Sequence, residues 1–246
     1  ATHLILCVGG SASVDGGIGA LREMGLTIVN NSPNRNYITD IKGINTELLQ
    51  QKFKEIHITI LCDVDNPICG PEGAAAVFAP QKGASPEQII MLDNQLCLWS
   101  DLLKQNTGKD ITQLKHGGAA GGITAAMYAL LNAQLISGSE YCLTLSRFHD
   151  NLLQAGVVIT GEGKIDLQSF YGKIPGTVAN LCQKHNVPVY AVVGLAEKQV
   201  LTRFDKVFIM SQYTRSIQDS IKNAPHYLKI ISQAIVDTLY LSAYSD

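Results

Sequence analysis

The residues with the most evident chemistry follow a short apolar run near position 160. The run 157–160 predicts a buried strand, and directly behind it stand glycines, acids and bases: Gly161, Glu162, Gly163, Lys164 and Asp166, then Lys173. Phosphoryl transfer needs this mixture, because a cation neutralises the moving phosphoryl group, a carboxylate holds a metal and a base takes the proton of the acceptor hydroxyl. We expect Lys164 and Asp166 to carry that chemistry. The alternative is a solvated polar loop.

A glycine-rich segment follows the first apolar run, residues 4–8. It contains Gly9, Gly10, Ser11, Asp15 and Gly16 and leads into a predicted helix. Glycines let backbone N–H groups approach a phosphate closely, and a helix N-terminus adds a favourable dipole. The segment is neither a Walker A loop nor a G-x-G-x-x-G fingerprint. It is interpreted either as an anion cradle or as a tight turn that needs small residues.

Two carboxylates, Asp63 and Asp65, stand at the end of another apolar run, residues 57–62. Side chains two residues apart in an extended chain point to the same side, so this pair could hold Mg²⁺ directly or through its waters. Asp65 also begins the sequence Asp-Asn-Pro, which is typical of turns. A purely structural turn is therefore the alternative.

A third glycine-rich segment covers residues 117–122, with Lys115 and His116 just ahead of it. It enters an alanine-rich predicted helix, where glycines could serve close helix packing as easily as phosphate binding. His116 is interpreted as a hydrogen-bonding loop residue rather than a catalyst.

Several strands and helices are needed to bring these segments together. Apolar runs predict strands at 4–8, 57–62, 157–160, 187–193 and 206–210, and apolar stripes of helical period predict helices at 86–106, 123–134, 175–185 and 228–243. This alternation is typical of an α/β protein with largely parallel sheets, in which ligands bind at the carboxyl ends of the strands. A change in pattern predicts two domains, 1–150 and 151–246.

The composition excludes several classes of protein. Of 246 residues, 46% are hydrophobic and 16% charged, and the net charge is −2, so we expect a globular protein without nucleic acid or membrane as partner. No apolar run reaches the roughly 18 residues that a membrane span needs. Without a signal-peptide pattern at the start, a cytoplasmic location is predicted. The six cysteines stand singly and are predicted to be buried free thiols.

Four of these stretches, together with residues 78–84, resemble signature segments of the bacterial type I glycerate kinases. They are residues 9–17, 62–67, 78–84, 118–122 and 161–166, in the family's order, and the resemblance extends over about residues 3–193. It implies two α/β domains with flanking helices, an inserted domain at 1–150 and part of a Rossmann-like domain at 151–246, with the site in the cleft between them. The implied reaction is the phosphorylation of D-glycerate by ATP, with Mg²⁺, to 2- or 3-phosphoglycerate.

Positions behind the strands predict the roles of particular residues. Asp166 and Lys164 are expected to be catalytic, although the sequence leaves the general base open among Asp15, Asp63, Asp65 and Asp166. Asp63 and Asp65, at a strand end, are expected to hold the metal. Substrate or phosphate would be bound by the following residues: Gly9, Gly10, Ser11, Asp15, Gly16, Lys82, Gly161, Glu162, Gly163 and Lys173.

The sequence departs from the family pattern in two places. Family members have a strand, a lysine-bearing loop and a glycine- and acid-rich motif well before the equivalent of His3, and the stretch 195–199 differs from their glycine–serine loop. We therefore expect the Rossmann-like domain to be incomplete in this chain, the chain to be a poor kinase by itself, and an open sheet edge to favour a homodimer. The alternative function is a non-catalytic remnant that binds a sugar acid or phosphate. A nicotinamide-dependent oxidoreductase is disfavoured because the first strand lacks G-x-G-x-x-G.

Overall fold

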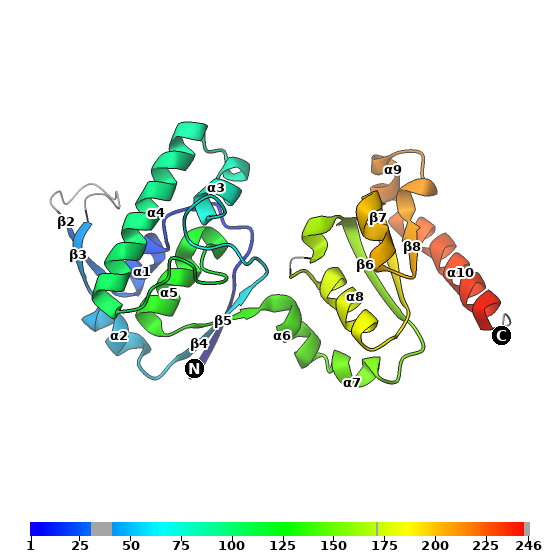
Figure 1. Ribbon diagram of the computed structural model, residues 1–246, viewed down its shortest axis with the longest axis horizontal. Helices are drawn as coiled ribbons and strands as arrows, with labels where there is room; N and C mark the ends of the chain where they lie inside the picture. The colour runs from blue at the N-terminus through cyan, green and yellow to red at the C-terminus, as the bar shows by residue number, and fades with distance from the viewer. Residues whose placement is uncertain (31–40, 171, 244–246) are drawn as a thin grey trace. The chain divides into compact units, whose positions relative to one another are not determined.

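The structure is a computed structural model, and it describes residues 1–30, 41–170 and 172–243 (Figure 1). The chain divides into two compact units, residues 1–141 and 142–246, whereas the sequence pattern places the boundary at 150. We call them unit 1 and unit 2 and describe each by itself.

Unit 1 is built on a parallel sheet of three strands: β1 (His3–Cys7), β4 (His57–Cys62) and β5 (Gln134–Ser137). The strand order is β1-β4-β5, and the register pairs Cys7 with Leu61 and Cys62 with Ser137. The carboxyl ends of all three strands therefore meet at one edge. A separate antiparallel pair consists of β2 (Thr27–Asn30) and β3 (Ile41–Asn45).

The helices of unit 1 are α1 (Ile18–Met24), α2 (Glu47–Phe53), α3 (Ala74–Phe78), α4 (Pro86–Thr107) and α5 (Ile123–Leu131), with 3-10 turns η2 (Pro80–Lys82) and η3 (Ala119–Gly122). The start of α4 agrees with the sequence signals, since Ser85 forms a capping box with Gln88 ahead of Pro86. The predicted helix 123–134 is too long. Asn132 ends α5 with φ at 55°, and the chain then enters β5, which the sequence pattern did not reveal.

The core of unit 1 centres on Trp99 of α4, which is fully buried. Leu96 and Leu103 lie on the same stripe of the helix and are also fully buried, as the period of the sequence predicts. The indole Nε1 of Trp99 donates a hydrogen bond of 3.1 Å to the carbonyl of Gly16. Trp99 therefore connects the core to the glycine-rich segment that follows β1.

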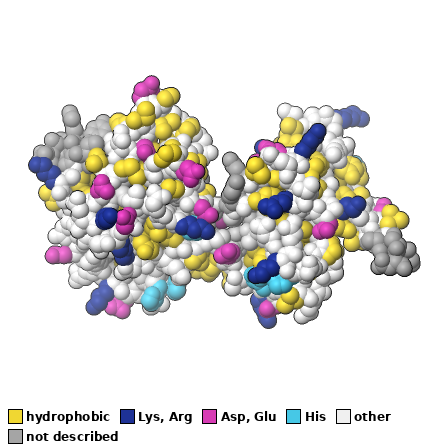
Figure 2. Space-filling model, in the orientation of Figure 1, with side chains coloured by type: hydrophobic (Ala, Val, Ile, Leu, Met, Phe, Trp, Pro, Cys, Tyr) yellow, Lys and Arg dark blue, Asp and Glu magenta, His cyan; other side chains and the backbone are white. Residues whose placement is uncertain are grey.

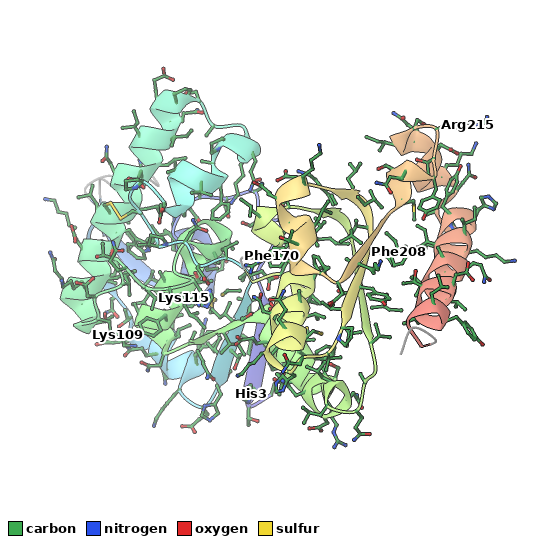
Figure 3. All side chains as sticks on the ribbon, turned by 45° about the vertical axis from the view of Figure 1, so that its right-hand side comes forward. His3, Lys109, Lys115, Phe170, Phe208 and Arg215 are labelled. Atoms are coloured by element: carbon green, nitrogen blue, oxygen red, sulfur yellow. A yellow bond between two sulfur atoms is a disulfide. The ribbon has the colours of Figure 1, made fainter. Side chains whose placement is uncertain are left out.

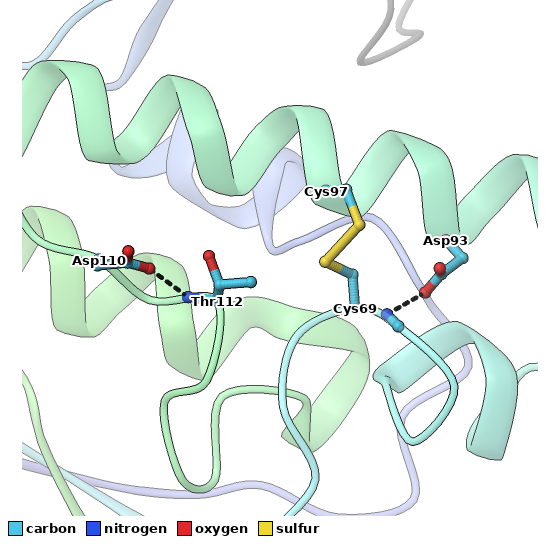
Figure 4. The surroundings of a disulfide bond; sticks show 6 residues. Cys69, Asp93, Cys97, Asp110 and Thr112 are labelled. Carbon is cyan, nitrogen blue, oxygen red and sulfur yellow. Dashed lines mark hydrogen bonds between the residues drawn. A yellow bond between two sulfur atoms is a disulfide. The ribbon is translucent and has the colours of Figure 1, made fainter.

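The cysteines correct the prediction of six buried free thiols. Cys69 and Cys97 form a disulfide between the segment after β4 and α4, with their Cα atoms 5.6 Å apart (Figure 4). Cys7 and Cys142 are free but exposed. Cys62 and Cys182 are buried free thiols, as predicted, and burial raises their pKa values to about 12 and about 11. The pairing depends on packing between segments 28 residues apart, which single cysteine positions do not reveal.

Unit 2 contains a second parallel sheet, with strand order β6 (Val158–Ile165), β7 (Val189–Ala196) and β8 (Lys206–Ile209). Its helices are α7 (Phe148–Leu152), α8 (Ile174–Lys184), α9 (Ile217–Lys222) and α10 (Ala224–Ala243), and α6 (Gly138–Leu145) spans the division between the units. Its described residues also form the 3-10 turns η4 (Leu167–Phe170), η5 (Lys198–Arg203) and η6 (Met210–Gln212).

The middle strand of unit 2 is covered on both faces. Val189 and Ala191 of β7 pack with α8 in one cluster, while Tyr190 packs with Ile231 and Ile235 of α10 in another. Burial on both faces explains why β7 is a continuous apolar run in the sequence.

Positive and negative side chains are interspersed on the face seen in Figure 2, in line with the net charge of −2. Across the described ranges, no helix has both the length and the apolar character to cross a membrane.

Replacing Trp99 tests the assignment of the unit 1 core. Trp99→Ala should destabilise unit 1 by about 3–5 kcal/mol, the usual cost of removing a buried aromatic side chain. Leu98→Ala is the matched control, because Leu98 is half exposed on the same helix and its loss should cost no more than about 0.5 kcal/mol. Hydrogen exchange in denaturant, followed by mass spectrometry, reports each unit separately. Equal effects of the two substitutions would contradict the assignment.

Candidate functional site

The loops after β1 and β4 enclose a cavity of about 240 Å³ at the carboxyl edge of the unit 1 sheet. Its wall consists of Val8, Gly9, Gly10, Ser11, Asp63, Val64, Phe78, Gln81, Lys82, Ala119 and Ala120. The structure thus brings together five of the predicted site residues: Gly9, Gly10, Ser11, Asp63 and Lys82. Phe78 and Gln81 belong to a stretch that carried the family resemblance, but the sequence gave no reason to select them individually.

Gly9 and Gly10 leave their backbone open to the cavity. A Cβ atom built on either residue would meet nothing within 4 Å, and Gly10 has φ at 65°. Close approach of a ligand to the peptide groups is therefore sterically free at this turn.

Lys82 lies beside this turn and supplies a cation. Its Nζ donates hydrogen bonds to the carbonyl of Ser13 at 2.7 Å and to Ser11 Oγ at 3.2 Å. Burial lowers the pKa of Lys82 below its ordinary value, and the nearby Asp15 opposes this in part. The ammonium group of Lys82, from η2, therefore contacts the loop after β1, next to Gly9 and Gly10.

Asp15 and Gly16 have structural contacts of their own. The carboxylate of Asp15 accepts backbone hydrogen bonds from Gly17 at 3.1 Å and from Gly19 at 3.0 Å, which fixes the turn into α1. A Cβ on Gly16 would stand 2.4 Å from Cδ1 of Trp99, so this glycine makes room for the indole. Asp15 also lines a second cavity of about 240 Å³ beside Gly9 and Ser11.

Asp63 and Asp65, the predicted metal ligands, differ in their surroundings. Asp63 lines the cavity, whereas Asp65 pairs with Lys115 at 3.4 Å and with His116 Nδ1 at 3.2 Å. Among the residues that the structure describes, no cluster of three or more His, Cys, Asp or Glu side chains is suited to hold a metal ion.

Gly118, just ahead of η3, and Gly121 within it allow close packing of loops. A Cβ on Gly118 would stand 2.2 Å from the carbonyl oxygen of Pro67, and one on Gly121 would stand 2.3 Å from that of Ser13. Backbone hydrogen bonds join the same loops, from Gly118 to Asn66 at 2.8 Å and from Gly16 to Gly121 at 2.9 Å. The segment holds the loops after β1 and β4 together.

In unit 2, the strand predicted at 157–160 is too short, because the residues behind it are also strand as far as Ile165 and do not form a polar loop. Residues up to Ile165 belong to β6, and Gly161 pairs with Val192 of β7. A Cβ on Gly161 would lie 2.8 Å from the carbonyl oxygen of Val192, and one on Gly194 would lie 2.4 Å from that of Gly163. Both contacts are between neighbouring strands, so glycine here permits close strand packing.

The charged residues of this strand form two lysine–carboxylate groups. Lys164 Nζ lies 3.2 Å from Asp166 Oδ2 and 3.2 Å from Glu197 Oε1. These hydrogen bonds, to Glu197 first and then to Asp166, raise the pKa of Lys164 above its ordinary value. Lys173 Nζ lies 3.6 Å from Glu162 Oε1. The sequence interpretation missed Glu197, which stands in the stretch that departs from the family pattern.

Ser169 connects the two groups. Its hydroxyl donates to Glu162 Oε2 at 2.7 Å, and its Oγ accepts the backbone N–H of Asp166 at 3.3 Å. Ser169 is fully buried, so it is a fixed support between the two carboxylates. The structure thus brings together Glu162, Lys164, Asp166 and Lys173.

The two parallel sheets, each with flanking helices, define an α/β protein. Comparison with known proteins makes this specific: the chain belongs to the glycerate kinase family, which matches residues 1–240. The predicted resemblance and the α/β fold with parallel sheets are both confirmed.

Individual relatives agree with this assignment. The chain is 38% identical to the glycerate kinase of Halalkalibacterium halodurans and 37% identical to the glycerate 2-kinase of Escherichia coli, over 78% and 79% of its own length. It spans 52% of each of those proteins, about half their length. The crystal structure of a protein designated glycerate kinase 2 from Salmonella typhimurium LT2 matches with a TM-score of 0.76 and 35% identity, covering 98% of this chain and 65% of that one.

Substitution at Gly161 tests whether this glycine serves strand packing. Gly161→Val should destabilise unit 2 by about 1–3 kcal/mol, because the added side chain collides with the β7 backbone. Gly163→Val is the matched control on the same strand, since a Cβ there meets nothing within 4 Å. Urea denaturation with exchange detection in unit 2 measures both. A Gly161→Val variant as stable as the original protein would contradict the packing role and favour a ligand-binding role for Gly161.

Proposed function

We propose that this protein transfers the γ-phosphoryl group of ATP to a hydroxyl of D-glycerate. The observation that carries the proposal is the cavity at the carboxyl edge of the unit 1 sheet, where open glycine backbone, Lys82 and Asp63 come together. Family membership supports the same reaction, because the relatives are named glycerate kinases.

The cavity suits the small acid better than the nucleotide. Its volume of about 240 Å³ lies below the roughly 300–1,000 Å³ typical of drug-sized pockets. The glycerate carboxylate would be bound by the backbone N–H groups of Gly9 and Gly10 and by the positive charge of Lys82. Phe78 and Val64 in the wall would exclude water from one side of the acid.

Unit 2 would supply the groups that act on the transferred phosphoryl group and the proton. In the reaction, the glycerate hydroxyl oxygen forms a bond to the γ-phosphorus, the bond between that phosphorus and the ADP oxygen breaks, and the hydroxyl proton is lost. Asp166 would accept or orient that proton, and Lys164 would neutralise charge on the phosphoryl oxygens. The raised pKa of Lys164 keeps this side chain charged over a wider range of pH. Glu162, paired with Lys173, would help to hold Asp166 in place, because Ser169 contacts both Glu162 and the backbone of Asp166.

Magnesium fits one of the two predicted ligands. Mg²⁺ in kinases is held by one or two carboxylates together with substrate phosphates and keeps several waters. Asp63 is exposed in the cavity wall and suits that role, whereas the carboxylate of Asp65 faces Lys115 and His116. The ion, when bound, would supply positive charge to the phosphates of ATP.

The function is tested by incubating the purified protein with D-glycerate, γ-labelled ATP and Mg²⁺. We expect label to appear in 2- or 3-phosphoglycerate, which chromatography separates, at the low rate of a poor kinase, and no transfer when glycerate is omitted. Binding of glycerate without any transfer would contradict the proposal.

Asp166→Asn tests the assignment of the base. If Asp166 takes the proton, the variant should lose roughly 10²- to 10⁴-fold in kcat while its KM for ATP changes little. Asp150→Asn is the control, because Asp150 is an exposed aspartate paired with Arg147 on α7. A folded Asp166→Asn enzyme with kcat within a few-fold of the original would exclude this role.

A further inference from the structure

His116 has a backbone conformation that is uncommon for a residue with a Cβ. Its φ is 67°, in the left-handed region that residues with a Cβ seldom adopt, and it is 8% exposed. A buried, unfavourable conformation persists only where surrounding contacts hold it. The contacts of the His116 ring and of the neighbouring backbone groups therefore explain how this conformation is maintained.

The ring of His116 is bound to the segment that follows β4, residues 63–67, which we call the aspartate loop. Its Nδ1 lies 2.7 Å from the carbonyl oxygen of Val64 and 3.2 Å from Asp65 Oδ1. Both partners are acceptors, so Nδ1 carries the proton and donates it. Lys115, labelled in Figure 3, pairs with the other oxygen of Asp65.

The backbone around His116 is fixed to both α5 and the aspartate loop. The hydroxyl of Thr124, a fully buried residue of α5, donates to the carbonyl of His116 at 2.7 Å. On the other side, the N–H of Gly118 donates to the carbonyl of Asn66 at 2.8 Å. A continuous set of hydrogen bonds thus leads from a rigid helix, through His116, to Val64 and Asp65.

The aspartate loop is also part of the cavity wall, because Asp63 and Val64 line it. From these contacts we propose that His116 is a positioning residue for phosphotransfer: it locks the aspartate loop so that Asp63 stands at the cavity. Asp65 accepts the N–H of the His116 ring and so supports the loop, and it is not a ligand of the metal. The kinetic part of this inference rests on the proposed function, whereas the part that concerns the loop does not.

Three substitutions separate the ring of His116 from its backbone. His116→Gly adopts the left-handed conformation freely but has no donor for Val64 and Asp65. His116→Asn tolerates the same conformation and offers an amide N–H in the position of Nδ1. Asn132→Gly is the matched control, since Asn132 has φ at 55° outside the aspartate loop.

Hydrogen exchange of peptides covering residues 63–67 and 116–118 measures the lock directly, without reference to catalysis. We expect His116→Gly and Asp65→Ala to speed exchange there by about tenfold, the effect of losing one hydrogen bond to a charged or buried group. His116→Asn, Asn132→Gly and Asp63→Ala should leave it within about twofold. Unchanged exchange in His116→Gly would overturn the proposal.

The catalytic consequence has its own readout. In an active enzyme, His116→Gly should lower kcat/KM for D-glycerate by about tenfold and weaken the response to Mg²⁺, and His116→Asn should restore both. Faster loop exchange with unchanged kinetics would also overturn the positioning role. If the original protein transfers no phosphate, the proposed function fails. The same variants are then judged by exchange and by binding of inorganic phosphate, where His116→Gly must bind more weakly than His116→Asn.

Discussion

The contact on which unit 1 depends is the close approach of three backbones at the carboxyl edge of its sheet. The loop after β1, the aspartate loop and η3 come so near each other that a Cβ on Gly118 or Gly121 would stand within 2.3 Å of a carbonyl oxygen. Hydrogen bonds from Gly118 to Asn66 and from Gly16 to Gly121 fix that approach. Because backbone hydrogen bonds hold the loops together, their side chains and the peptide groups of Gly9 and Gly10 can line the cavity.

This constraint divides the glycines into two kinds. Gly118 and Gly121 are packed against carbonyl oxygens and Gly16 against the Trp99 ring, and larger residues do not fit there. Gly9 and Gly10 face open space, and there a ligand can reach the peptide groups. The candidate site is therefore carried by a few residues, and the larger number of glycines around it build its frame.

Periodicity and capping predicted the long elements well. The helix at 86–106 and the strand at 57–62 agree with α4 and β4, because each has a clear apolar pattern and, for α4, a complete capping box. Short elements such as β5 were not predictable, since four residues after an apolar helix carry no period of their own. The glycines of β6 misled the prediction, because a strand that packs closely on its neighbour and a turn both favour glycine.

The candidate site was predictable in residue types but not in partners. Asp63 and Asp65 look alike in sequence, and only packing reveals that Asp65 is engaged by His116 and Lys115. Glu197 lies just after β7, 33 residues from Lys164 in the sequence, so no local pattern could predict the contact between them. The same limit applies to the disulfide of Cys69 and Cys97. These features depend on contacts between residues far apart in the sequence, and such contacts cannot be predicted from a single sequence.

The central claim is that D-glycerate binds at the carboxyl edge of the unit 1 sheet. The most direct test is a titration of the isotope-labelled protein with D-glycerate, in which backbone amide chemical shifts are followed residue by residue. We predict that the largest changes fall on Gly9, Gly10 and Ser11, with smaller ones at Lys82 and Asp63. Changes confined to residues outside the cavity wall, or none at saturating D-glycerate, would contradict the claim.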